Sequence, residues 1–199
     1  MTQSNPRVAE HKVDSLFVDR WSTRAFSGET IPDDVLYSAF EAVRWAPSGG
    51  NVQPWRLIYV KPGTEAWDRL FKTIAERNQI WSSRAGALVL FLSNKFRTKA
   101  GSTEKEPLRS HSFDTGAAWS NFAHQLVRDG WATRAIGGFN RDAARAEFAI
   151  PATWELEAII AVGKPAEASV LPEDFAKIDK PNGRLSVKEI VSEGSFAFA

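Results

Sequence analysis

The sequence contains no cysteine, which excludes disulfides, thiolate nucleophiles, iron–sulfur clusters and cysteine-based zinc sites. This composition fits a reducing compartment. A chain of 199 residues, 43% of them hydrophobic, is long enough to bury a core without a disulfide or a metal. We therefore expect one globular domain over residues 1–199, with no metal site.

Long apolar runs and an excess of charge of one sign are also missing. Residues 1–15 have no apolar core of the signal-peptide type, and no later stretch approaches the roughly 18 apolar residues of a membrane span. The 25 basic residues are balanced by 24 acidic ones, so no global field draws the chain onto nucleic acid or membrane. The sequence predicts a cytoplasmic protein without nucleic-acid or membrane partners, in which any anion must be bound locally.

Common catalytic motifs are absent as well. The sequence has no G-x-S-x-G elbow, P-loop, G-x-G-x-x-G or H-E-x-x-H segment. Its three histidines, His11, His111 and His124, lie at unrelated spacings, so each is interpreted as a surface or core residue. The pattern therefore predicts no catalytic acid or base supplied by the protein itself.

The hydrophobic pattern alternates between helix and strand. Helices are expected over residues 32–45, 64–81, 113–128 and 141–148, and strands over 55–60, 87–92, 131–136 and 154–162. The continuous apolar run 87–92 indicates a strand buried on both faces. The polar, basic stretch 95–109 predicts a mobile loop or lid, and the residues after 163 predict an irregular tail.

The segment Arg20-Trp-Ser-Thr-Arg24 is the first candidate binding motif. In an extended backbone, alternate residues share a side, so Arg20, Ser22 and Arg24 could converge on one anion while Trp21 and Thr23 point away. Two guanidiniums and a hydroxyl suit a phosphate. The alternative is a solvated basic turn.

Two further segments could contact a planar ligand. Residues 46–55 combine two glycines with Asn51 and Gln53, whose amides could read the edge of a heterocycle; a helix cap and turn is the alternative. Gly137 and Gly138 follow a predicted strand and could bring a backbone N–H against a flat ligand, or could simply form a tight turn.

Taken in their order along the chain, these segments resemble the FMN-dependent nitroreductase family. The resemblance runs from about residue 20 to the C-terminus. It is carried by R-x-S-x-R-x-F from Arg20, by A-P-S-x-x-N-x-Q-P-W from Ala46, by Asp114-x-Gly116 with Asn121, by Gly137-Gly138-Phe139 and by Gly183-Arg184-Leu185.

The resemblance implies an α+β protein with a three-layer α/β/α fold and a mixed central sheet. It implies a homodimer with two FMN sites at the interface, both subunits contributing to each, and residues 180–199 as a C-terminal arm that reaches the partner. The FMN-binding residues implied are Arg20, Trp21, Ser22, Arg24, Pro47, Ser48, Gly49, Asn51, Gln53, Gly137, Gly138 and Arg184.

The activity implied is hydride transfer from NADH or NADPH, through flavin N5, to a small electron-poor acceptor such as a nitroaromatic or quinone. No catalytic side chain is implied, because the flavin carries the chemistry and the backbone of Gly137 and Gly138 lies near N5. A flavin-binding or sensing module without efficient turnover is the alternative function, and a cofactor-free scaffold is a third.

Two positions depart from the family pattern. Gly137 stands where many members have Glu, and Asn182 stands where others have Lys. Lys180 is a candidate replacement for that lysine.

Overall fold

The computed structural model describes residues 5–99 and 101–198 and is built around one sheet. Strands β1 (Trp55–Val60), β2 (Ala87–Asn94), β6 (Trp154–Gly163) and β5 (Ala132–Ile136) lie side by side in that order. The structure confirms the α+β class, but the three strand pairs of this sheet are all antiparallel, so the expected mixed sheet is not found within the described chain.

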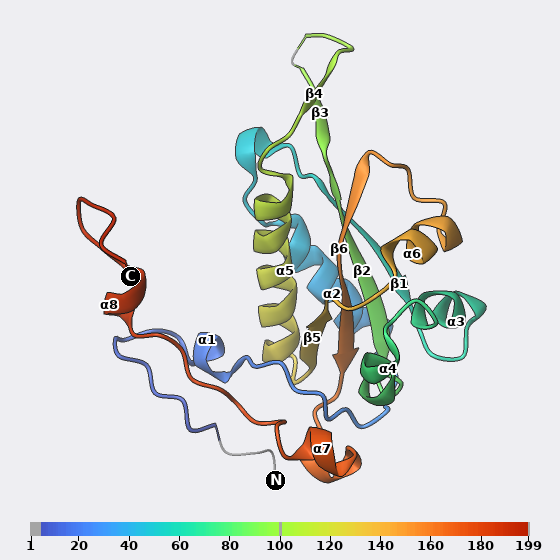
Figure 1. Cartoon of the computed structure of the whole chain (residues 1–199), viewed down its shortest axis with the longest axis vertical. Helices are drawn as coiled ribbons and strands as arrows, with labels where there is room; N and C mark the ends of the chain where they lie inside the picture. The colour runs from blue at the N-terminus through green and yellow to red at the C-terminus, as the bar shows by residue number, and fades with distance from the viewer. Residues whose placement is uncertain (1–4, 100, 199) are drawn as a thin grey trace.

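Helices cover both faces of the sheet, which confirms the three layers (Figure 1). α2 (Asp33–Arg44) and α5 (His111–Arg128) lie on one face, and α3 (Glu65–Phe71), α4 (Glu76–Ser82) and α6 (Arg141–Glu147) lie on the other. The predicted helices 32–45, 113–128 and 141–148 thus correspond to α2, α5 and α6.

The central strand β2 contributes to both hydrophobic cores, as its apolar run predicts. Leu88, Leu90 and Leu92 pack on the side of α3, α4 and α6, whereas Val89 and Phe91 pack on the side of α2 and α5. Alternate side chains of a strand point to opposite faces, so an unbroken apolar run is what a two-sided core requires.

The single helix predicted over residues 64–81 is wrong. It is interrupted between α3 and α4, where Thr73 and Ile74 turn toward the segment that follows β5. Ile74 forms an isolated bridge with Phe139, and the Ala75 N–H donates to the Gly138 carbonyl at 3.0 Å. These tertiary hydrogen bonds replace helical ones, which an amphipathic pattern alone does not reveal.

The stretch 95–109, for which the sequence predicts a mobile loop or lid, contains regular structure. It contains a hairpin of β3 (Phe96–Thr98) and β4 (Lys105–Pro107) that projects beyond the sheet (Figure 1). A cross-strand ion pair, Arg97 Nε to Glu106 Oε1 at 2.6 Å, joins its two strands. Charged side chains suit a solvated two-stranded ribbon, so polarity conceals the strand pattern here.

The two ends of the chain run beside each other, away from the sheet (Figure 1). The N-terminal segment leads into α1 (Ser15–Asp19), and the C-terminal segment contains η2 (Ala168–Val170), α7 (Glu173–Ala176) and α8 (Val187–Ile190). The Val187 N–H donates to Glu10 Oε2 at 3.0 Å, which fixes one segment to the other. Within residues 5–99 and 101–198, no helix has the length and apolarity to cross a membrane.

Candidate functional site

A basic cavity of about 510 Å³ lies beside β5, between the residues that follow α1 and those that follow α7. Ser22, Arg24 and Arg184, three of the residues expected to bind phosphate, line this cavity. Arg20 lies next to it and donates from Nη1 to Ser22 Oγ at 3.4 Å. Trp21, which the alternation places on the opposite side, is also among the residues that line the cavity.

Two arginines of this cavity were not found from the sequence. Arg7 comes from the N-terminal segment, and Arg134 comes from the middle of β5, where it donates to the Ser22 carbonyl. Neither belongs to a local motif, and only the fold brings them to Arg24. Asn182 and Lys180 line the same cavity, and Asn182 Oδ1 accepts hydrogen bonds from Arg7 and Arg184.

The arginines repel one another. The pKa of Arg7 is lowered by burial and then by Arg184 and Arg20, and the pKa of Arg20 is lowered by burial and then by Arg184. Burial and then Arg24 lower the pKa of Arg134, while Asp179 opposes this shift. Converging guanidiniums with one lining carboxylate favour a bound anion, since the anion would relieve this repulsion. The donor set therefore fits the phosphate of a nucleotide cofactor.

Asp179 fixes the backbone of the Arg20–Arg24 motif. Its carboxylate is 1% exposed and accepts hydrogen bonds from Thr23 Oγ1 at 2.7 Å, the Arg24 N–H at 2.8 Å and the Ala25 N–H at 3.2 Å. The Thr23 side chain is thus buried against Asp179. Arg24 Nη1 lies 3.7 Å from Asp179 Oδ1, so this carboxylate also orients the guanidinium.

The residues after Arg24 dock on the end of the sheet. The Ser27 N–H donates to the Lys164 carbonyl at 2.9 Å, and Phe26 is fully buried against Gly163. A Cβ at Gly163 would collide with the Phe26 ring, so glycine is required for this close approach. The docking places the basic motif along β5.

The loop after α2 holds two non-glycine residues in the left-handed region. Asn51 has φ 55° and Gln53 has φ 50°, and such strain concentrates at functional loops. The Gln53 N–H donates to Ser48 Oγ at 3.0 Å, and Gln53 Nε2 donates to Asn51 Oδ1 at 3.0 Å. Pro47 and Gly49 are exposed, so this loop presents an open, polar surface.

Helix α5 anchors this loop. The buried Asp114 accepts hydrogen bonds on Oδ2 from the Gly49 N–H at 3.2 Å and from Ser110 Oγ at 2.9 Å. About two helical turns on, Asn121 Nδ2 donates to the Ala42 carbonyl at 3.1 Å, near the end of α2. Asp114 therefore holds the loop on α5, and Asn121 holds the end of α2 on the same helix.

The two parts of the expected site are separated within one chain. The loop is held at Asp114, near the start of α5. The segment that leads into Arg20 packs near the end of α5, where Phe17 contacts His124 with ring centroids 4.9 Å apart. Ten residues of helix span about 15 Å. In the described residues, no hydrogen bond or ion pair joins residues 47–53 to residues 20–24.

Gly137 and Gly138 directly follow β5, the strand that carries Arg134. A Cβ at Gly137 would meet nothing within 4 Å, so its backbone faces open space, whereas a Cβ at Gly138 would lie 3.0 Å from Asn78 Nδ2. Neither residue has a positive φ, and the Phe139 N–H donates to the Gly137 carbonyl at 3.3 Å, so the chain turns here and the tight-turn alternative stays open. Arg141 Nη1 donates to the Gly137 carbonyl at 3.4 Å and helps to hold the segment.

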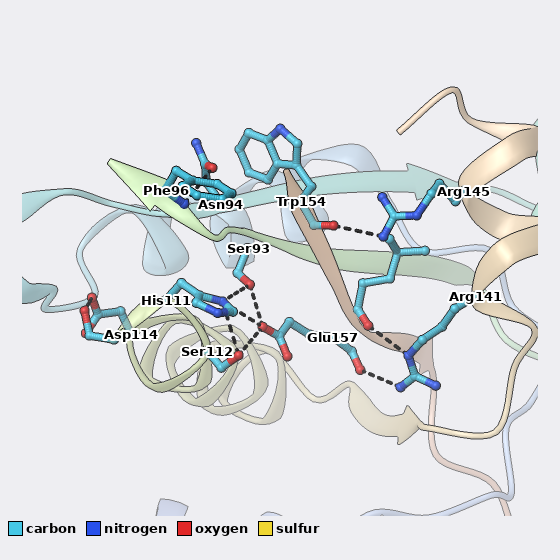
Figure 2. Close-up of polar contacts among 12 residues, drawn as sticks. Ser93, Asn94, Phe96, His111, Ser112, Asp114, Arg141, Arg145, Trp154 and Glu157 are labelled. Atoms are coloured by element: carbon cyan, nitrogen blue, oxygen red, sulfur yellow. Dashed lines mark hydrogen bonds and ion pairs between the residues drawn. The ribbon is translucent and has the colours of Figure 1, made fainter. Parts of the chain in front are cut away.

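A polar cluster at the start of α5 was missed because its members are far apart in sequence (Figure 2). His111 Nδ1 lies 2.7 Å from Ser93 Oγ, which donates to Glu157 Oε1 at 2.5 Å. Ser112 Oγ also donates to Glu157 Oε1, at 2.7 Å. Because Ser93 has one proton and gives it to Glu157, the consistent arrangement has His111 donating from Nδ1. His111 is therefore part of a hydrogen-bonded chain that can move a proton.

The backbone explains why Glu157 reaches this cluster. Phe91 pairs with Ala158 and Leu92 pairs with Leu156, so Glu157 is the extra residue of a β-bulge. A bulge redirects a side chain out of the regular alternation. Arg141 Nη2 donates to the Glu157 carbonyl at 3.4 Å (Figure 2), and its Nη1 donates to the Gly137 carbonyl, so Arg141 links the bulge to the glycine segment. Among residues 5–99 and 101–198, no group of three His, Asp or Glu side chains could hold a metal ion.

The hairpin contributes two more cavities next to the loop after α2. One of about 410 Å³ is lined by Val52, Arg97 and Trp154, among others, and one of about 470 Å³ is lined by Gly50, Arg97 and Lys99. Residues of the loop and basic residues of the hairpin thus share the same space.

Comparison with known proteins identifies the fold. The model of the Nitroreductase family matches residues 18–164. A crystal structure of an oxidoreductase containing FMN has a TM-score of 0.94 and 37% identity, with both chains covered completely. A nitroreductase family protein of Clostridium difficile 630 has a TM-score of 0.70 and 25% identity, covering 93% of this chain and 99% of its own.

A relative found by sequence comparison also carries the name of a nitroreductase. An NADH dehydrogenase/NAD(P)H nitroreductase of Streptomyces coelicolor is 26% identical over 176 residues, which are 81% of this chain and 87% of its own. The three-layer fold and these relatives define the chain as an enzyme of the oxidoreductase class. It belongs to the nitroreductase family, whose model covers well over half of its residues.

Proposed function

We propose that this protein is an FMN-dependent oxidoreductase that passes hydride from NADH or NADPH to a small electron-poor acceptor, such as a nitroaromatic or a quinone. The observation that carries the proposal is the basic cavity, where arginines from four segments converge around one carboxylate. Flavin-containing relatives of the same fold support the choice of FMN as the anion.

The residues of the chain fit a bound FMN in defined roles. Arg20, Ser22, Arg24 and Arg184 would hold the phosphate, and Arg134 adds a charge that the sequence did not indicate. The open backbone at Gly137, next to the more closely packed Gly138, would face the isoalloxazine ring. When bound, the flavin supplies hydride transfer at N5 and alternates between its two substrates, while the protein provides position and electrostatic stabilisation.

A homodimer would complete the site. Residues 47–53 pack near the start of α5, whereas the segment before residues 20–24 packs near its end. We therefore propose that the loop reaches the flavin held by the partner, through Pro47, Ser48, Gly49, Asn51 and Gln53. Large apolar side chains that are exposed in one chain support such an interface: Phe113 is 84% exposed and Trp45 72% exposed.

The absorption spectrum of the purified protein tests the function. We expect a yellow protein, or one that becomes yellow on addition of FMN, that is bleached by NADH or NADPH and is reoxidised by a quinone. Binding without rapid bleaching would favour the flavin-binding or sensing module. A protein that stays colourless in excess FMN would contradict the proposal.

The chain His111–Ser93–Glu157 is suited to supply the proton that accompanies each hydride. A two-electron reduction of the acceptor consumes one hydride and one proton, and general acids typically contribute factors of roughly 10² to 10⁴. Replacing Glu157 by Gln removes the anion that orders this chain. We expect kcat for a quinone to fall by about one to two decades, with FMN affinity unchanged.

The matched control is Glu155→Gln, two residues earlier on the same strand and outside the cluster. If Glu157→Gln and Glu155→Gln have equal kcat values, the cluster has only a structural role.

The hairpin is proposed to select the pyridine nucleotide. Its basic residues share cavities with the loop after α2 and could meet a 2′-phosphate. Neutralising Lys95, Arg97 and Lys99 together, each to Gln, should raise KM for NADPH roughly tenfold more than KM for NADH, because only NADPH carries the extra charge.

A second variant tests the sign of this effect. Glu106 pairs with Arg97 at 2.6 Å, so Glu106→Gln frees a positive charge and should lower KM for NADPH. Equal changes for both nucleotides would show that the hairpin does not read the phosphate.

A further inference from the structure

Arg7 joins three parts of the chain that are far apart in sequence. Its Nε donates to the Asn182 carbonyl at 2.7 Å and its Nη2 to Asn182 Oδ1 at 2.9 Å. Its Nη1 donates to the Arg20 carbonyl at 2.8 Å and to the Val18 carbonyl at 3.3 Å. One guanidinium thus uses most of its donors to hold the N-terminal segment, the end of α1 and the C-terminal segment together.

The partners of Arg7 are adjacent to the proposed phosphate ligands. It binds the backbone of Arg20 itself, and it binds Asn182, whose Oδ1 also accepts from Arg184 Nη1 at 2.9 Å. Arg20 and Arg184 are separated by more than 160 residues, and each lowers the pKa of Arg7. Such like charges would move apart unless hydrogen bonds held their backbones in place.

The rest of the N-terminal segment reinforces this arrangement. Asn5 Nδ2 donates to the Val18 carbonyl at 3.0 Å and to Asp19 Oδ1 at 3.1 Å, and Asn5 Oδ1 accepts from the Arg7 N–H at 3.2 Å. Arg7 is therefore a fixed residue rather than a solvated side chain of a free terminus, and it also lines the basic cavity.

We propose that Arg7 and Asn182 form a latch that positions Arg20 and Arg184 on the phosphate of the flavin nucleotide. Arg7 is a positioning residue: most of its N–H groups bind carbonyl and amide oxygens of the chain, and its charge adds to the field in the cavity. The inference rests on the proposed function, since it takes FMN as the anion. It assigns a role in cofactor binding to the N-terminal segment, which lies before the family motif begins.

FMN and riboflavin, which differ by the phosphate, provide the test. Arg7→Ala should weaken FMN binding roughly 10- to 100-fold, as expected for the loss of one or two charge-assisted contacts, and should leave riboflavin binding unchanged. Asn182→Ala should have a similar effect, and the double variant should be little worse than either single one because the two residues act as one unit. Arg7→Lys keeps the positive charge but lacks the planar guanidinium that binds several oxygens at once, so it should retain only part of the FMN affinity.

Lys12→Ala is the matched control, because it removes an exposed positive charge from the same segment. Hydrogen exchange of the full-length chain provides a readout independent of flavin: in Arg7→Ala, the amides around residues 182–187 should exchange faster. Normal FMN affinity in Arg7→Ala would overturn the latch, and so would an equal loss of FMN and riboflavin. Failure of the unmodified protein to bind FMN would instead overturn the proposed function and the latch with it.

Discussion

Replacing Arg20 and Arg24 together by Ala is expected to weaken FMN binding by roughly two to four decades while the fold is retained. Charge-assisted hydrogen bonds contribute on the order of 1.5 to 3 kcal/mol each, so the loss of two corresponds to a few kcal/mol. The structure explains why the fold should survive. Asp179 keeps its hydrogen bonds from Thr23 Oγ1 and from the backbone N–H groups of Arg24 and Ala25, none of which needs the arginine side chain.

Flavin fluorescence titration measures this effect, and circular dichroism checks the fold. The control is Lys72→Ala with Arg128→Ala, which also removes two positive charges, but from exposed positions outside the cavity. Unchanged FMN affinity in the Arg20 and Arg24 variant would refute the phosphate assignment. Unfolding of that variant would show that the arginine side chains are needed for the fold itself and not only for a ligand. Arg24→Gln, which removes the charge but keeps much of the side-chain volume, would then separate the effect of charge from that of packing.

The sequence predicts most of the regular elements because local patterns determine them. The strand β1 has the predicted bounds, and β2 was expected to be buried on both faces since its apolar run is continuous. The break between α3 and α4 could not be predicted in this way. It exists because Ile74 and Ala75 bind the segment around Gly138, a contact between residues more than 60 positions apart.

The same distinction between local sequence pattern and tertiary contact applies to the candidate site. Arg20, Ser22 and Arg24 are recognisable as a motif because they are adjacent in sequence and share one side of an extended segment. Arg7, Arg134 and Asp179 carry no local signal, and only tertiary structure brings their charges to the same cavity. The hydrogen-bonded chain of His111, Ser93 and Glu157 was missed for the same reason, since a bulge in β6 directs Glu157 toward Ser93.

Truncation after Asp179 is expected to weaken both self-association and FMN binding. The two terminal rings are poorly covered in one chain, since Phe196 is 86% exposed and Phe198 37% exposed. Among the aromatic rings of the described residues, each contacts only the other, with ring centroids 5.2 Å apart. Burying a Phe contributes roughly 1.5 to 3 kcal/mol, so each arm that docks both rings on the partner would strengthen the dimer by at most about two to four decades, before the entropy of ordering the arm is subtracted.

The same arm carries Arg184 and Asn182, so its removal should also lower FMN affinity by at least roughly tenfold. The hydrophobic cores contain no residue after Ala176, and Asp179 is kept, so the domain should remain folded. Sedimentation measures the dimer and flavin titration measures the site. Phe196→Ala with Phe198→Ala separates the two roles: it should weaken the dimer while leaving Arg184 in place, and it should reduce FMN affinity only at concentrations where the dimer dissociates. A truncated chain that forms a tight dimer and binds FMN normally would show that the arm serves neither purpose.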